Sequence, residues 1–131
     1  MSLDLKYLLL SALLMFVQVL IAAASANQAV GLTALAGNRE DLPVFTGFAG
    51  RARRAHLNML ENMVLFTALV LIAHVAGKAN ATTAMGALIF FWGRLVYAVI
   101  YLLGVPWLRT LAWAVSVIGM AMVAWPLFAA M

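Results

Sequence analysis

Four long apolar segments determine what this chain of 131 residues can fold into. Each segment has, or nearly has, the roughly 20 apolar residues with which a helix crosses the hydrocarbon core of a membrane. The composition agrees, because 67% of the residues are hydrophobic, 9% are charged and the mean hydropathy is +1.08. We therefore predict an all-α integral membrane protein. The first apolar run is too long for the hydrophobic region of a signal peptide, so we expect it to be a retained span.

Glycine, asparagine and proline mark the ends of the predicted helices. Gly37, Gly77 and Gly104 are expected stops, because glycine tolerates the left-handed conformation that ends many helices. Asn80 is a suitable N-cap, and Pro106 suits the first turn of the last helix. The single predicted domain, residues 1–131, therefore contains helices at about 3–36, 47–76, 81–103 and 106–130. Their short to moderate connections predict an up-down antiparallel four-helix bundle.

The composition also limits the chemistry. The chain has no cysteine, which excludes disulfides, thiolate metal sites and a thiol nucleophile of its own, so any thiol must come from a substrate. We expect no metal. The net charge of +4 comes from too few positive side chains to indicate a nucleic-acid partner. Those side chains suit anionic lipid headgroups or an anionic ligand.

Charge in the connections predicts the orientation of the bundle. Five arginines flank the connections at one end, and two lysines flank the other: Arg39, Arg51, Arg53, Arg54 and Arg109 against Lys6 and Lys78. This bias places the long loop in the cytoplasm and both termini outside. The loop, residues 37–50, either orders over a site or is a plain connector.

One polar stretch, Arg51–Asn62 (RARRAHLNMLEN), stands out in this apolar chain. The apolar residues after it, Met63–Ala73, cover only about 17 Å of a hydrocarbon core about 30 Å thick, so about two turns of the stretch enter the bilayer. At about 100° per residue, Arg54, Asn58, Glu61 and Asn62 share one helix face, with Arg51 above them. Each charge at membrane depth costs about 2.5–3.5 kcal/mol, so we expect this face to contact protein or a polar cavity rather than lipid.

The third predicted helix carries a matching face with Arg94, Tyr97 and Tyr101. Arg94 lies about 15 Å below the cytoplasmic end of its helix, at the depth of Glu61. We predict that Glu61 and Arg94 form an ion pair within or between subunits. The alternative role of such a pair is structural, to fix helix register.

Above that pair, Asn58, Arg54, Tyr101 and Arg109 are expected to form a polar pocket that opens toward the cytoplasmic interface. Its surplus guanidinium groups require an anion, which is either a lipid phosphate or a small-molecule carboxylate. The two tyrosines are alternatively interfacial aromatic residues.

Other polar residues have simpler interpretations. Gln18, midway along the first helix, is expected to hydrogen-bond to another helix. Arg53 and His56 lie off the polar face and are expected to contact headgroups. His74 is expected near the opposite membrane interface.

The residues RRAHLNMLEN (Arg53–Asn62), then Arg94-x-x-Tyr97-x-x-x-Tyr101 and Arg109, resemble the MAPEG family, the membrane-associated proteins in eicosanoid and glutathione metabolism. The resemblance extends over all four helices. It implies a homotrimer that binds glutathione between neighbouring subunits, near the cytoplasmic side. The residues with implied roles are Arg51, Arg54, Asn58, Glu61, Arg94 and Tyr97 as glutathione contacts, and Tyr101 and Arg109 as catalytic residues, with Arg109 in the place of the thiolate-stabilising arginine.

The chain departs from eukaryotic members at two places. Residues 25–28 contain no basic residue where those members carry an arginine, and Asn62 replaces a tyrosine found in some of them. The short loops resemble a bacterial member, which implies a bacterial inner membrane.

The preferred function is a glutathione transferase or peroxidase that acts on lipophilic electrophiles or lipid hydroperoxides. The main alternative is a non-catalytic lipid-binding protein of the same fold. A small four-helix multidrug exporter is a third possibility, but it needs a buried acid in the first helix. Asp4 is expected to lie too near the terminus, which leaves Glu61 of the second helix as the only buried acid.

Overall fold

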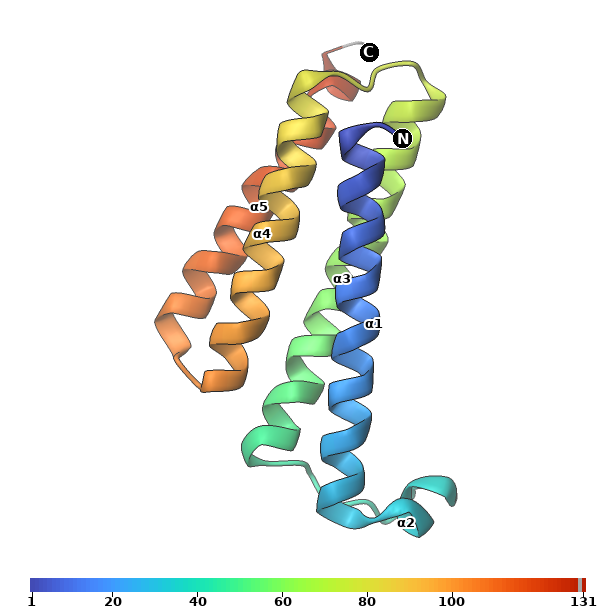
Figure 1. Cartoon of the computed structure of the whole chain (residues 1–131), viewed down its shortest axis with the longest axis vertical. Coiled ribbons are helices and arrows are strands. Elements are labelled where there is room, and N and C mark those ends of the chain that lie inside the picture. The colour runs from blue at the N-terminus through green and yellow to red at the C-terminus, as the bar shows by residue number, and fades with distance from the viewer. Residues whose placement is uncertain (130) are drawn as a thin grey trace.

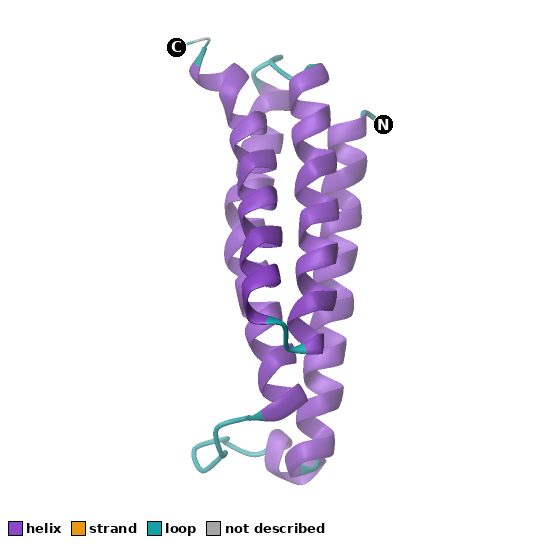
Figure 2. Ribbon diagram, turned by 90° about the vertical axis from the view of Figure 1, so that its left-hand side faces the viewer, coloured by secondary structure: helices purple, strands orange, loops and turns teal. Residues whose placement is uncertain are grey.

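The computed structural model, which describes residues 1–129 and 131, has four long helices and one short helix. The helices are α1 (Leu3–Val30), α2 (Leu32–Ala36), α3 (Gly47–Val75), α4 (Ala81–Leu103) and α5 (Pro106–Phe128). The long helices run side by side in alternating directions, with both termini at one end and α2 beside the other end of α1 (Figures 1 and 2). All four long helices are apolar and long enough to cross a membrane, which confirms the predicted all-α membrane bundle.

The first helix differs from its prediction, because it ends at Val30 rather than at residue 36. Gly31 has φ +84° and ψ 159°, a conformation that only glycine adopts readily, and the chain turns there into the separate helix α2. The sequence did not distinguish this glycine from one tolerated within a helix. At the other end of the chain, α5 ends at Phe128, and the predicted helical residue Ala130 lies outside the described residues.

Large side chains pack α3 against α4, whereas glycines pack α4 against α5. Phe66 of α3 stacks on Phe90 of α4 with ring centroids 3.8 Å apart, and both side chains are fully buried. Helices α4 and α5 approach much more closely, because a Cβ atom at Gly86 would lie only 2.5 Å from the carbonyl oxygen of Gly119. Small residues commonly allow such close contacts between membrane helices.

The end of the bundle near the termini is joined by a polar cluster that the sequence did not predict. Asp4 is 2% exposed, and its Oδ1 lies 2.9 Å from His74 Nε2. The Thr83 hydroxyl donates to Asp4 Oδ2 at 3.1 Å, so the cluster connects α1, α3 and α4. The expectation that Asp4 is not a buried acid was therefore wrong. This carboxylate is occupied by His74 and Thr83 at the helix end.

Gln18 also differs from its prediction. The side chain is 5% exposed, but within the described part of the chain neither of its amide atoms has a hydrogen-bond partner. The reason is that it faces small and aliphatic side chains of α3 and α4, among them Ala55 and Ala98, around a cavity of about 10 Å³. The predicted bond between helices is absent.

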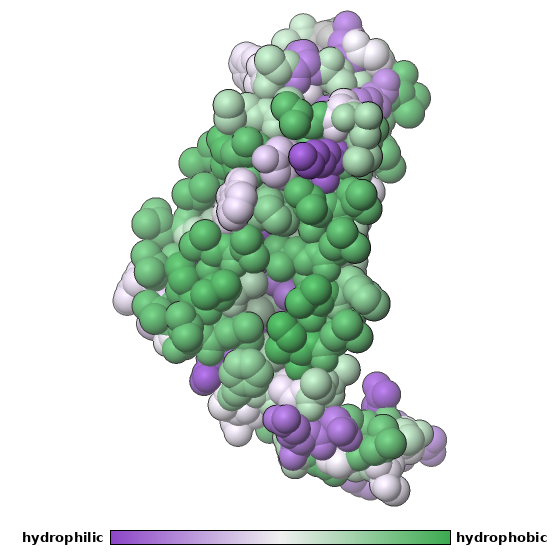
Figure 3. Space-filling view, in the orientation of Figure 1, coloured by the Kyte–Doolittle hydropathy of each residue, from purple (hydrophilic) through white to green (hydrophobic). Residues whose placement is uncertain are grey.

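The face of the molecule drawn in Figure 3 is mostly apolar over the middle of the bundle. Figure 3 shows hydrophobic residues across the central part of the molecule and hydrophilic residues gathered toward its two ends. This pattern matches a chain whose middle contacts lipid and whose ends contact headgroups and water.

Candidate functional site

Tyr101 is the meeting point of α3, α4 and α5 at the end of the bundle away from the termini. Arg54 of α3 donates from Nε to the Tyr101 hydroxyl at 3.2 Å. The guanidinium carbon of Arg109, from the first turn of α5, lies 4.5 Å from the centre of the Tyr101 ring. One buried tyrosine therefore has a cation at its hydroxyl and another against its ring. The second contact is a cation–π interaction, and both guanidinium groups are suited to bind an anion.

The local sequence explains how Arg54 and Arg109 reach this tyrosine. Gly104 adopts a left-handed conformation, with φ +82°, which ends α4 and returns the chain into α5. Gly50 leaves room beside Arg54, because a Cβ atom there would lie 3.1 Å from Arg54 Nη1 and 2.4 Å from the Phe45 carbonyl oxygen.

Arg94 lies deeper in the bundle and is fully buried. Its Nη2 donates to Asn58 Oδ1 at 2.9 Å, and its Nε contacts the sulfur of Met59 at 3.3 Å. The guanidinium carbon also lies 4.3 Å from the centre of the Tyr97 ring. Within the described residues, Arg94 Nη1 has no hydrogen-bond partner, so this cation is only partly satisfied by its own chain.

The two tyrosines connect the deep and shallow parts of the site. The rings of Tyr97 and Tyr101 are 5.5 Å apart and meet edge to face. Tyr101 contacts Arg54 and Arg109, and Tyr97 contacts Arg94. Arg94 in turn contacts Asn58. The structure therefore brings together six of the eight residues proposed for the site.

Arg51 and Glu61 are the two that stand apart. Arg51 donates from Nε to the Leu102 carbonyl oxygen at 3.0 Å, which satisfies a free carbonyl at the end of α4. Glu61 is exposed, and the predicted ion pair between Glu61 and Arg94 is absent within the chain. Among the described residues, the only acidic and basic side chains within ion-pair distance of each other are Asp4 and His74 at the other end.

The physical reason for the missing pair is the position of Glu61 on its helix. Asn58 turns toward α4 and is half-buried, and Asn62 is buried beside it. Glu61 lies about 60° to the other side of Asn58, since three residues advance an α-helix by about 300°. That rotation moves its carboxylate out of the contact between α3 and α4 and leaves it exposed.

Two contacts in the site were missed from the sequence. The Asn62 amide donates to the Asn58 carbonyl oxygen at 2.8 Å, and the i to i+4 spacing of the two asparagines was an available signal for this bond. Nothing in the sequence indicated that the Met59 sulfur would contact Arg94, because methionine is a common filler in membrane helices.

A comparison of the sequence with models of protein families finds a matching family. The model of the MAPEG family matches residues 5–129, which include every residue of the site. The chain belongs to the MAPEG family. The resemblance predicted from the motifs on the second and third long helices is therefore confirmed. Comparisons with curated proteins and with solved structures find no match.

Membership also bears on the alternatives. A MAPEG protein with a polar site near one end of its bundle has no need of the mid-membrane acid that an exporter requires. In this MAPEG protein the buried acid of α1 is instead held at the helix end by His74 and Thr83.

Proposed function

We propose that this MAPEG protein binds glutathione and activates its thiol for transfer to lipophilic electrophiles or for reduction of lipid hydroperoxides. The observation that carries the proposal is the placement of Arg54 at the hydroxyl and Arg109 at the ring of Tyr101, with no carboxylate among the described residues paired to either guanidinium. Such a site attracts an anion and has no internal one.

The charges of glutathione fit the charges around the site. The molecule has two carboxylates, for which Arg51, Arg54 and the unpaired Nη1 of Arg94 are donors. It also has one ammonium group, for which the exposed carboxylate of Glu61 is a partner. We assign Asn58 and Tyr97 to positioning, since they hold Arg94 in place.

Arg109 and Tyr101 are assigned to the thiol itself. A free thiol with a pKa of about 8.5 is only about 3% ionised at pH 7. A guanidinium beside the sulfur that lowers this pKa by about 2 stabilises the thiolate by roughly 2.7 kcal/mol and makes it the main form. The Tyr101 hydroxyl, already polarised by Arg54, supplies a hydrogen bond to the same sulfur.

The thiolate has two reactions open to it. With an electrophilic carbon, its electron pair forms the C–S bond, and the leaving group departs or a proton is taken up. With a hydroperoxide, the sulfur attacks the outer oxygen and the O–O bond breaks. The lipid leaves as an alkoxide that takes up a proton from water to become an alcohol, and a second glutathione converts the sulfenic acid to glutathione disulfide and water.

A homotrimer with sites between subunits explains the exposed charges of α3. Glu61 lies about 15 Å along the helix from Arg51, at a depth where an unpaired charge in lipid costs about 2.5–3.5 kcal/mol. A neighbouring subunit would cover this carboxylate and complete the glutathione site. We place the site at the cytoplasmic side of a bacterial inner membrane, following the arginine bias.

The test is a stopped-flow titration of the purified protein with glutathione, with the far-ultraviolet absorbance of the thiolate as the signal. We expect a saturable thiolate signal at neutral pH that is lost in Arg109→Ala. The control is Lys78→Ala, at the opposite end of the bundle, which should retain the signal. If millimolar glutathione gives no signal in the wild type, the non-catalytic lipid-binding function becomes the better assignment.

A further inference from the structure

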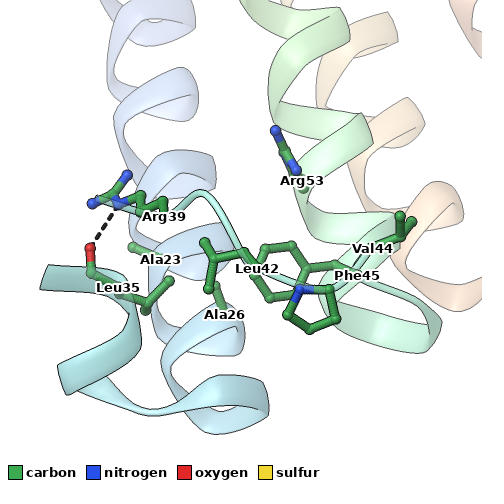
Figure 4. Close-up of a pocket in the computed structure, with 9 residues that line it drawn as sticks. Ala23, Ala26, Leu35, Arg39, Leu42, Val44, Phe45 and Arg53 are labelled. Carbon is green, nitrogen blue, oxygen red and sulfur yellow. Dashed lines mark hydrogen bonds between the residues drawn. The ribbon is translucent and has the colours of Figure 1, made fainter. Parts of the chain in front are cut away.

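A second group of arginines faces a cavity that the glutathione site does not use. The cavity has a volume of about 490 Å³ and lies among the last turns of α1, helix α2, the loop after it and the start of α3 (Figure 4). Its wall is apolar, with Ala26, Leu42 and Phe45 among the lining residues. The exceptions are two guanidinium groups, from Arg39 and Arg53.

Among the described residues, no acidic side chain forms an ion pair with either arginine. Arg53 comes from α3, and its guanidinium carbon lies 6.0 Å from the centre of the Phe45 ring. Arg39 donates from Nε to the Leu35 carbonyl oxygen at 2.6 Å, which leaves its terminal nitrogens free for a ligand. The nearest acids in sequence, Glu40 and Asp41, line a neighbouring pocket of the loop that Arg39 also borders, but within the described residues neither forms an ion pair with Arg39.

The backbone at Arg39 is held in an uncommon conformation. Its φ is +64°, the left-handed region that L side chains rarely adopt, and it is the only non-glycine residue with positive φ in the described part of the chain. A glycine or asparagine would suit this turn better, so the arginine is present against the local backbone preference. Such positions are frequent where a side chain serves a ligand.

The cavity lies at headgroup depth. Ala23, on its wall, follows Leu3 by about 20 residues, which is roughly 30 Å of helix and equals the thickness of the hydrocarbon core. One side chain of its wall, Val44, is apolar and 87% exposed. An apolar wall with two cations at this depth fits an amphiphile whose charged group is a phosphate.

We propose that this cavity binds the phosphate headgroup of an anionic membrane lipid. Arg39 and Arg53, which line opposite sides of the cavity (Figure 4), supply the positive charge around the headgroup, and Leu42 and Phe45 contact the glycerol and the first acyl carbons. The proposal is independent of glutathione, because neither arginine contacts Tyr101, Arg94 or Arg109. It also gives the loop between α2 and α3 a role as one wall of a lipid site rather than as a plain connector.

The experiment is native mass spectrometry of the full chain in detergent with phosphatidylglycerol or phosphatidylcholine of identical acyl chains. We expect one phosphatidylglycerol per chain to be retained in preference to phosphatidylcholine. In the double variant Arg39→Gly, Arg53→Gln this binding should weaken by at least about tenfold, from the loss of two charge-assisted contacts. Lys78→Gln removes one charge at the other end of the bundle and should leave the preference unchanged.

The choice of glycine at position 39 keeps the test informative, because glycine fits the positive φ and the loop should fold at least as well. Equal retention of the two lipids, or a preference that persists in the double variant, would overturn the proposal. Displacement of the lipid by soluble glycerol phosphate would identify a site for free phosphate instead. Displacement by glutathione would make the cavity part of the glutathione site. The thiolate titration with Arg109→Ala reports separately on that site.

Discussion

Replacing Asn58 with leucine should destabilise the protein because it removes the only oxygen, among the described residues, that accepts a hydrogen bond from Arg94. That cation is fully buried, and within the described residues its remaining contacts are the Met59 sulfur and the face of the Tyr97 ring. Neither replaces a carbonyl oxygen as an acceptor. Leucine branches at the same carbon as asparagine but cannot accept a hydrogen bond, so the change removes the acceptor and keeps the branched shape of the side chain.

The magnitude follows from the charge on the donor. The bond from Arg94 Nη2 to Asn58 Oδ1 is 2.9 Å long, and a hydrogen bond to a charged group contributes about 1.5–3 kcal/mol. We therefore expect Asn58→Leu to lower the free energy of unfolding by about 2–3 kcal/mol. Arg94→Met removes the buried charge itself, and a hydrophobic residue of similar length often replaces such a charge at little cost or with a gain.

The assay is a double-mutant cycle in one detergent without glutathione, with the free energy of unfolding measured for the wild type, both single variants and the double variant. In the Arg94→Met background, Asn58→Leu should cost less than about 1 kcal/mol, because no cation remains to be satisfied. The expected coupling is therefore about 1.5–2.5 kcal/mol. The reasoning is refuted if Asn58→Leu costs the same in both backgrounds.

Three further substitutions test the packing and the polar contacts by thermal unfolding in detergent. Gly119→Ala should lower the free energy of unfolding by about 1–3 kcal/mol, because its Cβ would lie 2.6 Å from backbone atoms of α4. The control Gly37→Ala should be tolerated, because the nearest atom to its Cβ lies at 3.7 Å. Similar losses in the two variants would contradict the close helix contact. Gln18→Leu should raise stability by about 1 kcal/mol by removing a buried amide without a partner, and a loss would show that the amide is bonded. Asp4→Ala should cost about 1–3 kcal/mol, while the exposed control Asp41→Ala should cost little; equal effects would argue against the buried cluster.

The sequence by itself determined the helices and the family. Four apolar segments of spanning length leave a membrane chain little choice but helices, and the end signals at Asn80, Gly104 and Pro106 are local properties of the backbone. The motif around Arg54 and Asn58 was sufficient to indicate the MAPEG family. The sequence did not determine the break at Gly31, because a glycine in an apolar run is compatible with both a continuous helix and a turn.

Only the tertiary structure decided which polar groups meet. The helix period puts Asn58 and Glu61 on the same broad face, but a difference of about 60° places one against Arg94 and the other outside. The pairing of Asp4 with His74 joins residues 70 positions apart, which depends on how α1 and α3 align along their lengths. The lipid cavity likewise exists only because the loop folds back between two helix ends. Helix formation depends on local sequence, whereas these contacts depend on the rotation and axial position of whole helices, which many residues set together.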